Sequence, residues 1–115
     1  MKAEISWKVE YQHEMEHAIA AREAGNEGMA RVCARRATGV IVGEYLRRFG
    51  YTKLSTSIFD LISFFLSLPG IDRQCQDIAS HFLIKVNNDH SLPNDIDLIS
   101  DAHWLAENLL FERTG

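Results

Sequence analysis

Apolar residues recur along this chain at the spacing of α-helices, and no segment shows the strict alternation of a β-strand. The first predicted helix runs from about Glu4 to Ala24, and Gly25 ends it before Asn26 caps the next helix. One face of this helix forms a stripe that we expect in the core: Trp7, Tyr11, Met15, Ala18 and Ile19.

The second predicted helix, from about Glu27 to Phe49, has three distinct faces. The first is a seam of small residues that permits close helix packing: Met29, Ala30, Cys33, Ala34, Ala37 and Ile41. The second carries Arg31, Arg35, Val42 and Leu46, and the third carries Arg36, Gly39, Gly43 and Arg47. Because little of this helix faces only solvent, we expect it at the centre of a bundle. The spacing of Gly39 and Gly43 indicates a tight helix crossing.

The next predicted helix, Ile58 to Leu68, is apolar except for a narrow polar stripe, and Ser55 or Thr56 can cap it. A helix this apolar must be buried on two sides, and we assign its second side to a subunit interface. We therefore expect a homodimer whose interface contains Phe59, Phe64, Phe65 and Trp104.

Two further helices complete the pattern. Asp72 caps a helix to about Val86, a polar loop spans Asn87 to Asn94, and Pro93-Asn94-Asp95 starts the last helix. In that helix Trp104 falls opposite a buried line of Leu98, Ala102, Leu105 and Leu109, broadened by Ile99, Ala106 and Leu110. The sequence therefore predicts an all-α fold, an antiparallel four- to five-helix bundle that forms a single domain over residues 1–115.

Composition narrows the class of protein. Hydrophobic residues make up 46% and charged residues 24%, and the net charge of −4 gives no global attraction for nucleic acid. The two cysteines are too few for a disulfide framework. The N-terminus is too polar for a secretory signal, and the longest apolar stretch is too short to span a bilayer. We expect a cytoplasmic protein without a membrane partner or a cofactor.

His13-Glu14-Met15-Glu16-His17 matches the H-E-x-x-H pattern of zinc hydrolases, in which two histidines at i and i+4 hold zinc. The pattern is short, however, and both histidines point away from the core stripe, towards solvent. A third ligand is missing from the pattern, with Glu44 as a remote choice. We favour an exposed histidine pair and keep the zinc hydrolase as a remote alternative.

The arginines of the second helix are candidates for binding an anion. Arg31 and Arg35 are neighbours one turn apart, whereas Arg36 and Arg47 flank the two glycines. Guanidinium groups beside a glycine groove can hold a phosphate or carboxylate through paired hydrogen bonds. The competing interpretation, which we favour for Arg31 and Arg35, is pairing with acidic residues of the first and last helices.

The layout of the helices resembles that of the HEPN superfamily, the higher-eukaryote and prokaryote nucleotide-binding helical domains. The likeness covers a long first helix, a Gly-Asn turn, an alanine-rich second helix, two shorter helices and a C-terminal helix. The segment GNEGMARVCARRATG resembles that of the small bacterial branch. The resemblance implies a binding or partner-interaction module, with a nucleotide, RNA or another protein as partner.

Many members of that superfamily are ribonucleases, with an arginine followed by four to six residues and then a histidine between two protomers. The nearest match here is Arg73 and His81, which have seven residues between them, Gln74 to Ser80. The spacing departs from the signature, so the resemblance implies the non-catalytic branch. A metal-independent ribonuclease or toxin component, in which His81 moves a proton and Arg73 stabilises the phosphorane, is the alternative.

Overall fold

The structure, a computed structural model, describes residues 2–84 and 96–111. These residues form five α-helices and one short 3₁₀ helix: α1 (Lys2–Glu23), α2 (Glu27–Arg48), α3 (Ile58–Ser67), α4 (Arg73–Ser80), η1 (His81–Leu83) and α5 (Leu98–Leu109). No strand occurs in the described part of the chain, so the prediction of an all-α fold is confirmed.

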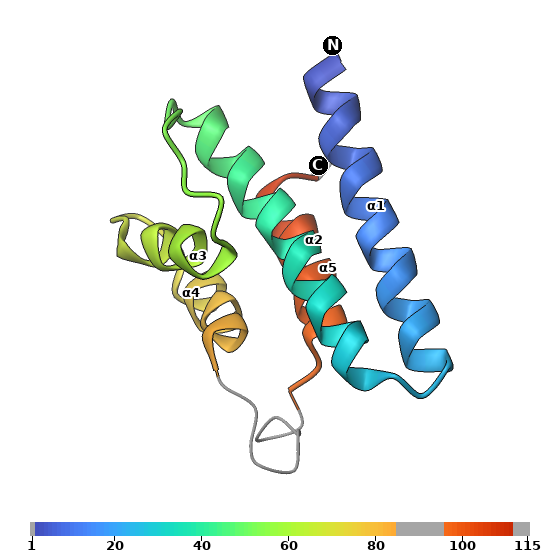
Figure 1. Cartoon of the computed structure of the whole chain (residues 1–115). Coiled ribbons are helices and arrows are strands. Elements are labelled where there is room, and N and C mark those ends of the chain that lie inside the picture. The colour runs from blue at the N-terminus through green and yellow to red at the C-terminus, as the bar shows by residue number, and fades with distance from the viewer. Residues whose placement is uncertain (1, 85–95, 112–115) are drawn as a thin grey trace.

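The long helices α1 and α2 are antiparallel, and α5 lies behind α2 (Figure 1). The direction of α5 differs from the prediction. The start of α5 meets the end of α1, because Asp97 is bonded to Arg22, and its end returns to the start of α1, where Phe111 lies 5.5 Å from Trp7 between ring centroids. Consequently α5 is antiparallel to α1 and parallel to α2, and the bundle is not antiparallel throughout.

The central position predicted for α2 is confirmed, because this helix contacts α1, α3 and α5. Its small residues Ala30, Cys33, Ala34 and Ala37 are buried in the seam. Two predicted core residues are not buried, since Ile19 is 46% and Met29 45% exposed. Each of these residues is next in sequence to a buried residue of its helix. One residue further along an α-helix turns a side chain by about 100° around the helix axis, so Ile19 and Met29 point towards the surface.

Capping residues determine where several of the helices begin and end. Gly25 adopts a φ of +82° after α1, and the Asn26 side chain accepts a hydrogen bond from the Met29 amide at 3.0 Å. The cap of α3 is Ser57, whose hydroxyl accepts from the Asp60 amide at 3.3 Å, rather than Ser55 or Thr56.

Two predicted helix limits are wrong. Asp72 caps α4 as expected, but this helix ends at Ser80 and tightens into η1 instead of continuing towards Val86. The last helix begins at Leu98 with Asp97 as its cap, because this carboxylate accepts from the Ile99 and Ser100 amides. Val86, the polar loop Asn87–Asn94 and the start assigned to Pro93–Asp95 lie outside the described residues.

The core forms where α1, α2, α3 and α5 meet. Its largest fully buried side chains include Phe65, Phe82, Ile41, Leu46, Ile62, Leu98 and Leu105. Along α5 the predicted line is buried at Leu98, Ala102 and Leu105, whereas Leu109 is half-buried. Trp104 does not point away from the bundle, because it is half-buried and packs against the core.

None of the described helices is both long and apolar enough to cross a membrane.

Candidate functional site

The strongest candidate site is a groove of about 460 Å³ that α1, α2 and the start of α3 enclose together with the segment 52–56. We call it the arginine groove. Its α2 side is formed by Arg36, Gly39, Gly43 and Arg47, which recur every three or four residues and so share one face of the helix. Glu10 and Glu14 line it from α1, and the hydroxyl residues Thr52, Ser55 and Thr56 line it from the connection.

The two glycines shape the floor of the groove. A Cβ atom on Gly39 would lie 3.1 Å from Cγ1 of Ile58, so the glycine lets α3 approach α2 closely. A Cβ atom on Gly43 would lie 3.5 Å from Nη1 of Arg47, so the guanidinium lies over this glycine. The expected close crossing is thus present, with α3 as the second helix, and it also places the Arg47 side chain.

The two arginines of the groove differ in their partners. Arg36 is exposed, and no hydrogen bond or ion pair joins it to another residue in the described part of the chain. Arg47 contacts Glu44 through an Nη2–Oε1 pair at 3.5 Å, and Arg48 donates from Nε to the other oxygen of Glu44 at 3.2 Å. Glu44, which is buried, therefore holds both arginines at the end of α2 and leaves Arg47 half exposed.

Arg31 and Arg35 do not line the arginine groove. Arg35 donates from Nε to the Phe82 carbonyl at 3.5 Å, and its guanidinium lies 5.9 Å from the Phe59 ring centroid. Burial, reinforced by the charge of Arg31, lowers the pKa of Arg35. Arg35 is thus partly buried against a carbonyl and a ring rather than paired with the acidic residues that the sequence suggested.

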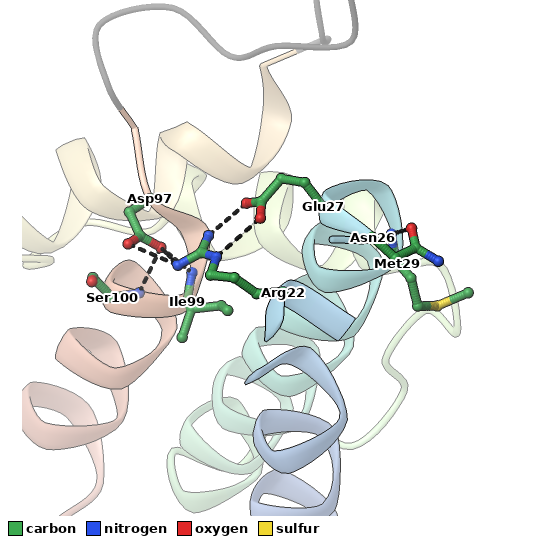
Figure 2. A network of polar contacts seen from close by, with 7 residues as sticks. All are labelled: Arg22, Asn26, Glu27, Met29, Asp97, Ile99 and Ser100. Carbon is green, nitrogen blue, oxygen red and sulfur yellow. Dashed lines mark hydrogen bonds and ion pairs between the residues drawn. The ribbon is translucent and has the colours of Figure 1, made fainter. Parts of the chain in front are cut away.

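Sequence reasoning missed the main ion-pair network, which centres on Arg22 at the end of α1 (Figure 2). Its guanidinium donates to both oxygens of Asp97 at 3.0 Å, and to Glu27 at 3.0 Å from Nε and 2.6 Å from Nη2. The sequence did contain a signal for this network: a basic residue in the last turn of α1 and acidic residues at the starts of α2 and α5. Such side chains can pair wherever the ends of their helices are adjacent.

The structure does not bring Arg73 and His81 together. They stand at opposite ends of α4, about 12 Å apart along the helix axis. Arg73 is exposed, whereas His81 is tied to α5 by a 2.8 Å hydrogen bond between Nδ1 and Oδ2 of Asp101. Burial raises the pKa of Asp101, although the bond to His81 opposes this shift.

His13 and His17 are exposed on α1, and their rings stack with centroids 6.1 Å apart. Within residues 2–84 and 96–111, no three side chains of histidine, cysteine, aspartate or glutamate gather as a metal site. Glu44, the remote third ligand, is instead bonded to Arg47 and Arg48.

The four residues expected at a subunit interface occupy different environments. Phe65 is completely buried and packs edge-on against Tyr45, so it belongs to the core and offers no surface to a partner. Phe59 is 50% and Phe64 37% exposed, but they point about 140° apart around α3. Trp104 lines a separate hollow between α1 and α5 with Met15 and Ile19.

The chain matches no protein-family model, no curated protein and no solved structure. Its function is therefore inferred from the geometry and chemistry of the arginine groove.

Proposed function

We propose that this protein is a non-catalytic, HEPN-like binding module whose arginine groove receives the anionic group of a small ligand. The observation that carries the proposal is that Arg36 and Arg47 line the same groove, before and after Gly39 and Gly43 along α2. Planar guanidinium groups suit the paired oxygens of a phosphate or carboxylate.

The walls of the groove supply further contacts for such a ligand. The hydroxyls of Thr52, Ser55 and Thr56 can donate to anionic oxygens. A neighbouring hollow of about 490 Å³ shares this connection and is lined by Tyr51, Phe64 and other residues. Its aromatic side chains suit an apolar or aromatic part, so a nucleotide is a ligand of suitable chemistry.

The proposed module pairs with a second copy of itself through the side of α3 that exposes Phe59. Phe59, which is 50% exposed, supports this part of the proposal, because large exposed apolar side chains gain most from burial at an interface. Sedimentation at micromolar concentrations is expected to give a dimer, and the Phe59→Ser variant is expected to shift the equilibrium towards monomer. A wild-type protein that stays monomeric at high micromolar concentration would remove the dimer from the proposal.

Binding is tested by NMR titration of the ¹⁵N-labelled protein with inorganic phosphate and with adenosine 5′-monophosphate. We expect the largest shifts at the Gly39 and Gly43 amides, and affinities about tenfold lower in Arg36→Gln and Arg47→Gln. Arg73→Gln is the matched control, because Arg73 is exposed and lies outside the groove. The proposal fails if neither probe shifts the groove, or if Arg73→Gln weakens binding as much.

A metal-independent ribonuclease is the second candidate, and the bond between His81 and Asp101 favours it. A carboxylate on Nδ1 fixes the orientation and tautomer of an imidazole that acts through Nε2. Wild-type protein that cleaves single-stranded RNA, with cleavage lost in both His81→Ala and Arg73→Ala, would support this candidate over the binding module. Absence of cleavage by the wild type would end it.

A further inference from the structure

The hollow between α1 and α5 shares no lining residue with the arginine groove. The two helices meet near both of their ends, where Arg22 is bonded to Asp97 and where Phe111 packs on Trp7. Between these contacts lies an open hollow of about 760 Å³. Because the end contacts hold the helices in place, the hollow is already formed without a partner. We call it the α1–α5 furrow, and the lining residues that matter below are Met15, Ile19, Ile99, Trp104 and Glu107.

Apolar side chains from both helices line the furrow. Ile19 is 46% exposed, and Ile99 and Trp104 are half-buried. The lining residues of α5 extend from Ile99 to Asn108, roughly 14 Å along the axis or two and a half helical turns. An amphipathic helix presents an apolar stripe of this length and packs well between two antiparallel helices. The shape and the lining of the furrow therefore suit a helix.

The charged side chains in and beside the furrow are acidic. Glu107 lines it, and Glu16 and Glu23 are exposed on α1, next to Met15 and one turn beyond Ile19. Within residues 2–84 and 96–111, these three carboxylates form no ion pair, and no lysine or arginine lines the furrow. The adjacent Arg22 is already bonded to two other carboxylates. The charge of the furrow is thus complementary to a basic partner.

We infer that the α1–α5 furrow docks a basic amphipathic helix of another protein. The apolar side of that helix packs on Ile19, Ile99 and Trp104, and its lysines or arginines face Glu16, Glu23 and Glu107. A second copy of this chain fits less well, because a twofold interface at the furrow brings the acidic edges of both copies together. The inference is independent of the anion site and of the dimer proposed through α3.

Three model peptides test the inference by titration into the ¹⁵N-labelled protein. The first is a helix of about 14 residues with leucines on one side and lysines elsewhere. The second has glutamates in place of the lysines, and the third has the composition of the first with the leucines spread around the helix. The first peptide is expected to shift the Trp104 indole and the Ile19 and Ile99 amides. The third should bind about tenfold more weakly and the second not measurably.

Variants of the protein separate the apolar and the charged parts of the furrow. Ile19→Ser is expected to weaken binding of the first peptide about tenfold. Val9→Ser is the matched control, because Val9 is 48% exposed on α1 outside the furrow, and it should leave binding unchanged. The double variant Glu16→Gln/Glu107→Gln should weaken binding and reduce its dependence on salt. Asp77→Asn, which removes an exposed carboxylate from α4, should do neither.

Three results would overturn the inference. One is that the third peptide binds as tightly as the first, and another is that Val9→Ser weakens binding as much as Ile19→Ser. The last is a wild-type dimer in sedimentation that Ile19→Ser dissociates, which makes a second copy the occupant of the furrow. Binding of phosphate in the arginine groove is measured separately, so the anion site stands or falls on its own result.

Discussion

Arg22 donates to both carboxylate oxygens of Asp97 at 3.0 Å and so joins the end of α1 to the start of α5, 75 residues away in the sequence (Figure 2). The same carboxylate caps α5 by accepting from the Ile99 and Ser100 amides. On its other side the guanidinium holds Glu27 in the first turn of α2. One arginine therefore fastens three helix ends.

Loss of this arginine is expected to destabilise the fold moderately. Arg22→Gln should lower the free energy of unfolding by about 1–2 kcal/mol, because two carboxylates lose a charged donor but remain partly exposed to water. Urea denaturation measures this. Arg73→Gln removes the same charge from an exposed position and should change stability by less than about 0.5 kcal/mol. Equal losses in the two variants would show that the network contributes nothing.

The same network predicts a loss of stability in acid. The hydrogen bond from Arg22 lowers the pKa of Glu27 below its ordinary value of 4.5. Burial opposes ionisation of Asp97, but hydrogen bonds from Ser100 and Arg22 outweigh it and lower that pKa below 3.8. Because the folded state binds these protons less readily, their contribution is full above about pH 5 and decreases as pH falls through the ordinary pKa values and below. Urea midpoints between pH 6 and pH 3 should fall less steeply in Arg22→Gln than in the wild type, and parallel curves would contradict this account.

The two sides of α3 are expected to respond differently to truncation. Phe65→Ala should cost about 3–5 kcal/mol, because it opens a cavity in a completely buried region. Phe59→Ala should cost less than about 1 kcal/mol, since half of this side chain is exposed. Thermal or urea unfolding of dilute protein compares them, and a larger loss at Phe59 would contradict the placement of α3.

The two glycines of α2 also differ in what a methyl group would meet. At Gly43 its neighbours would lie at 3.5–3.8 Å, an ordinary contact distance, so Gly43→Ala should stabilise the helix by about 0.5–1 kcal/mol. At Gly39 the methyl would lie 3.1 Å from Ile58, and the resulting displacement offsets that gain. The melting temperature of Gly43→Ala should be higher than that of Gly39→Ala. The reverse order would contradict the close approach of Ile58 in α3 to Gly39.

Much of the fold could be predicted because local patterns set it. The caps at Asn26 and Asp72, the small-residue seam of α2 and the buried side of α5 are read from neighbouring residues. The direction of α5 could not be read in this way. It depends on which helix ends meet, and a contact such as Arg22–Asp97 joins residues far apart in the chain.

The candidate site was only partly predictable. The helical period places Arg36, Gly39, Gly43 and Arg47 on one face, and they do line one groove. Period alone does not reveal which face another helix covers, so Phe65 was assigned to a surface although it lies in the core. The approach of Glu14 to the same groove depends on the packing of α1 against α2 and has no signature along the chain.

The position of α5 sets the order in which the molecule can assemble. The helical hairpin of α1 and α2 needs only local contacts and can form early, whereas Phe111 reaches Trp7 and Tyr11 across nearly the whole chain. Until α5 docks, the side of α2 that packs against α5 stays open to water or to other chains. The slow, long-range step is thus the one that closes the core, and the period before it is when aggregation competes with folding.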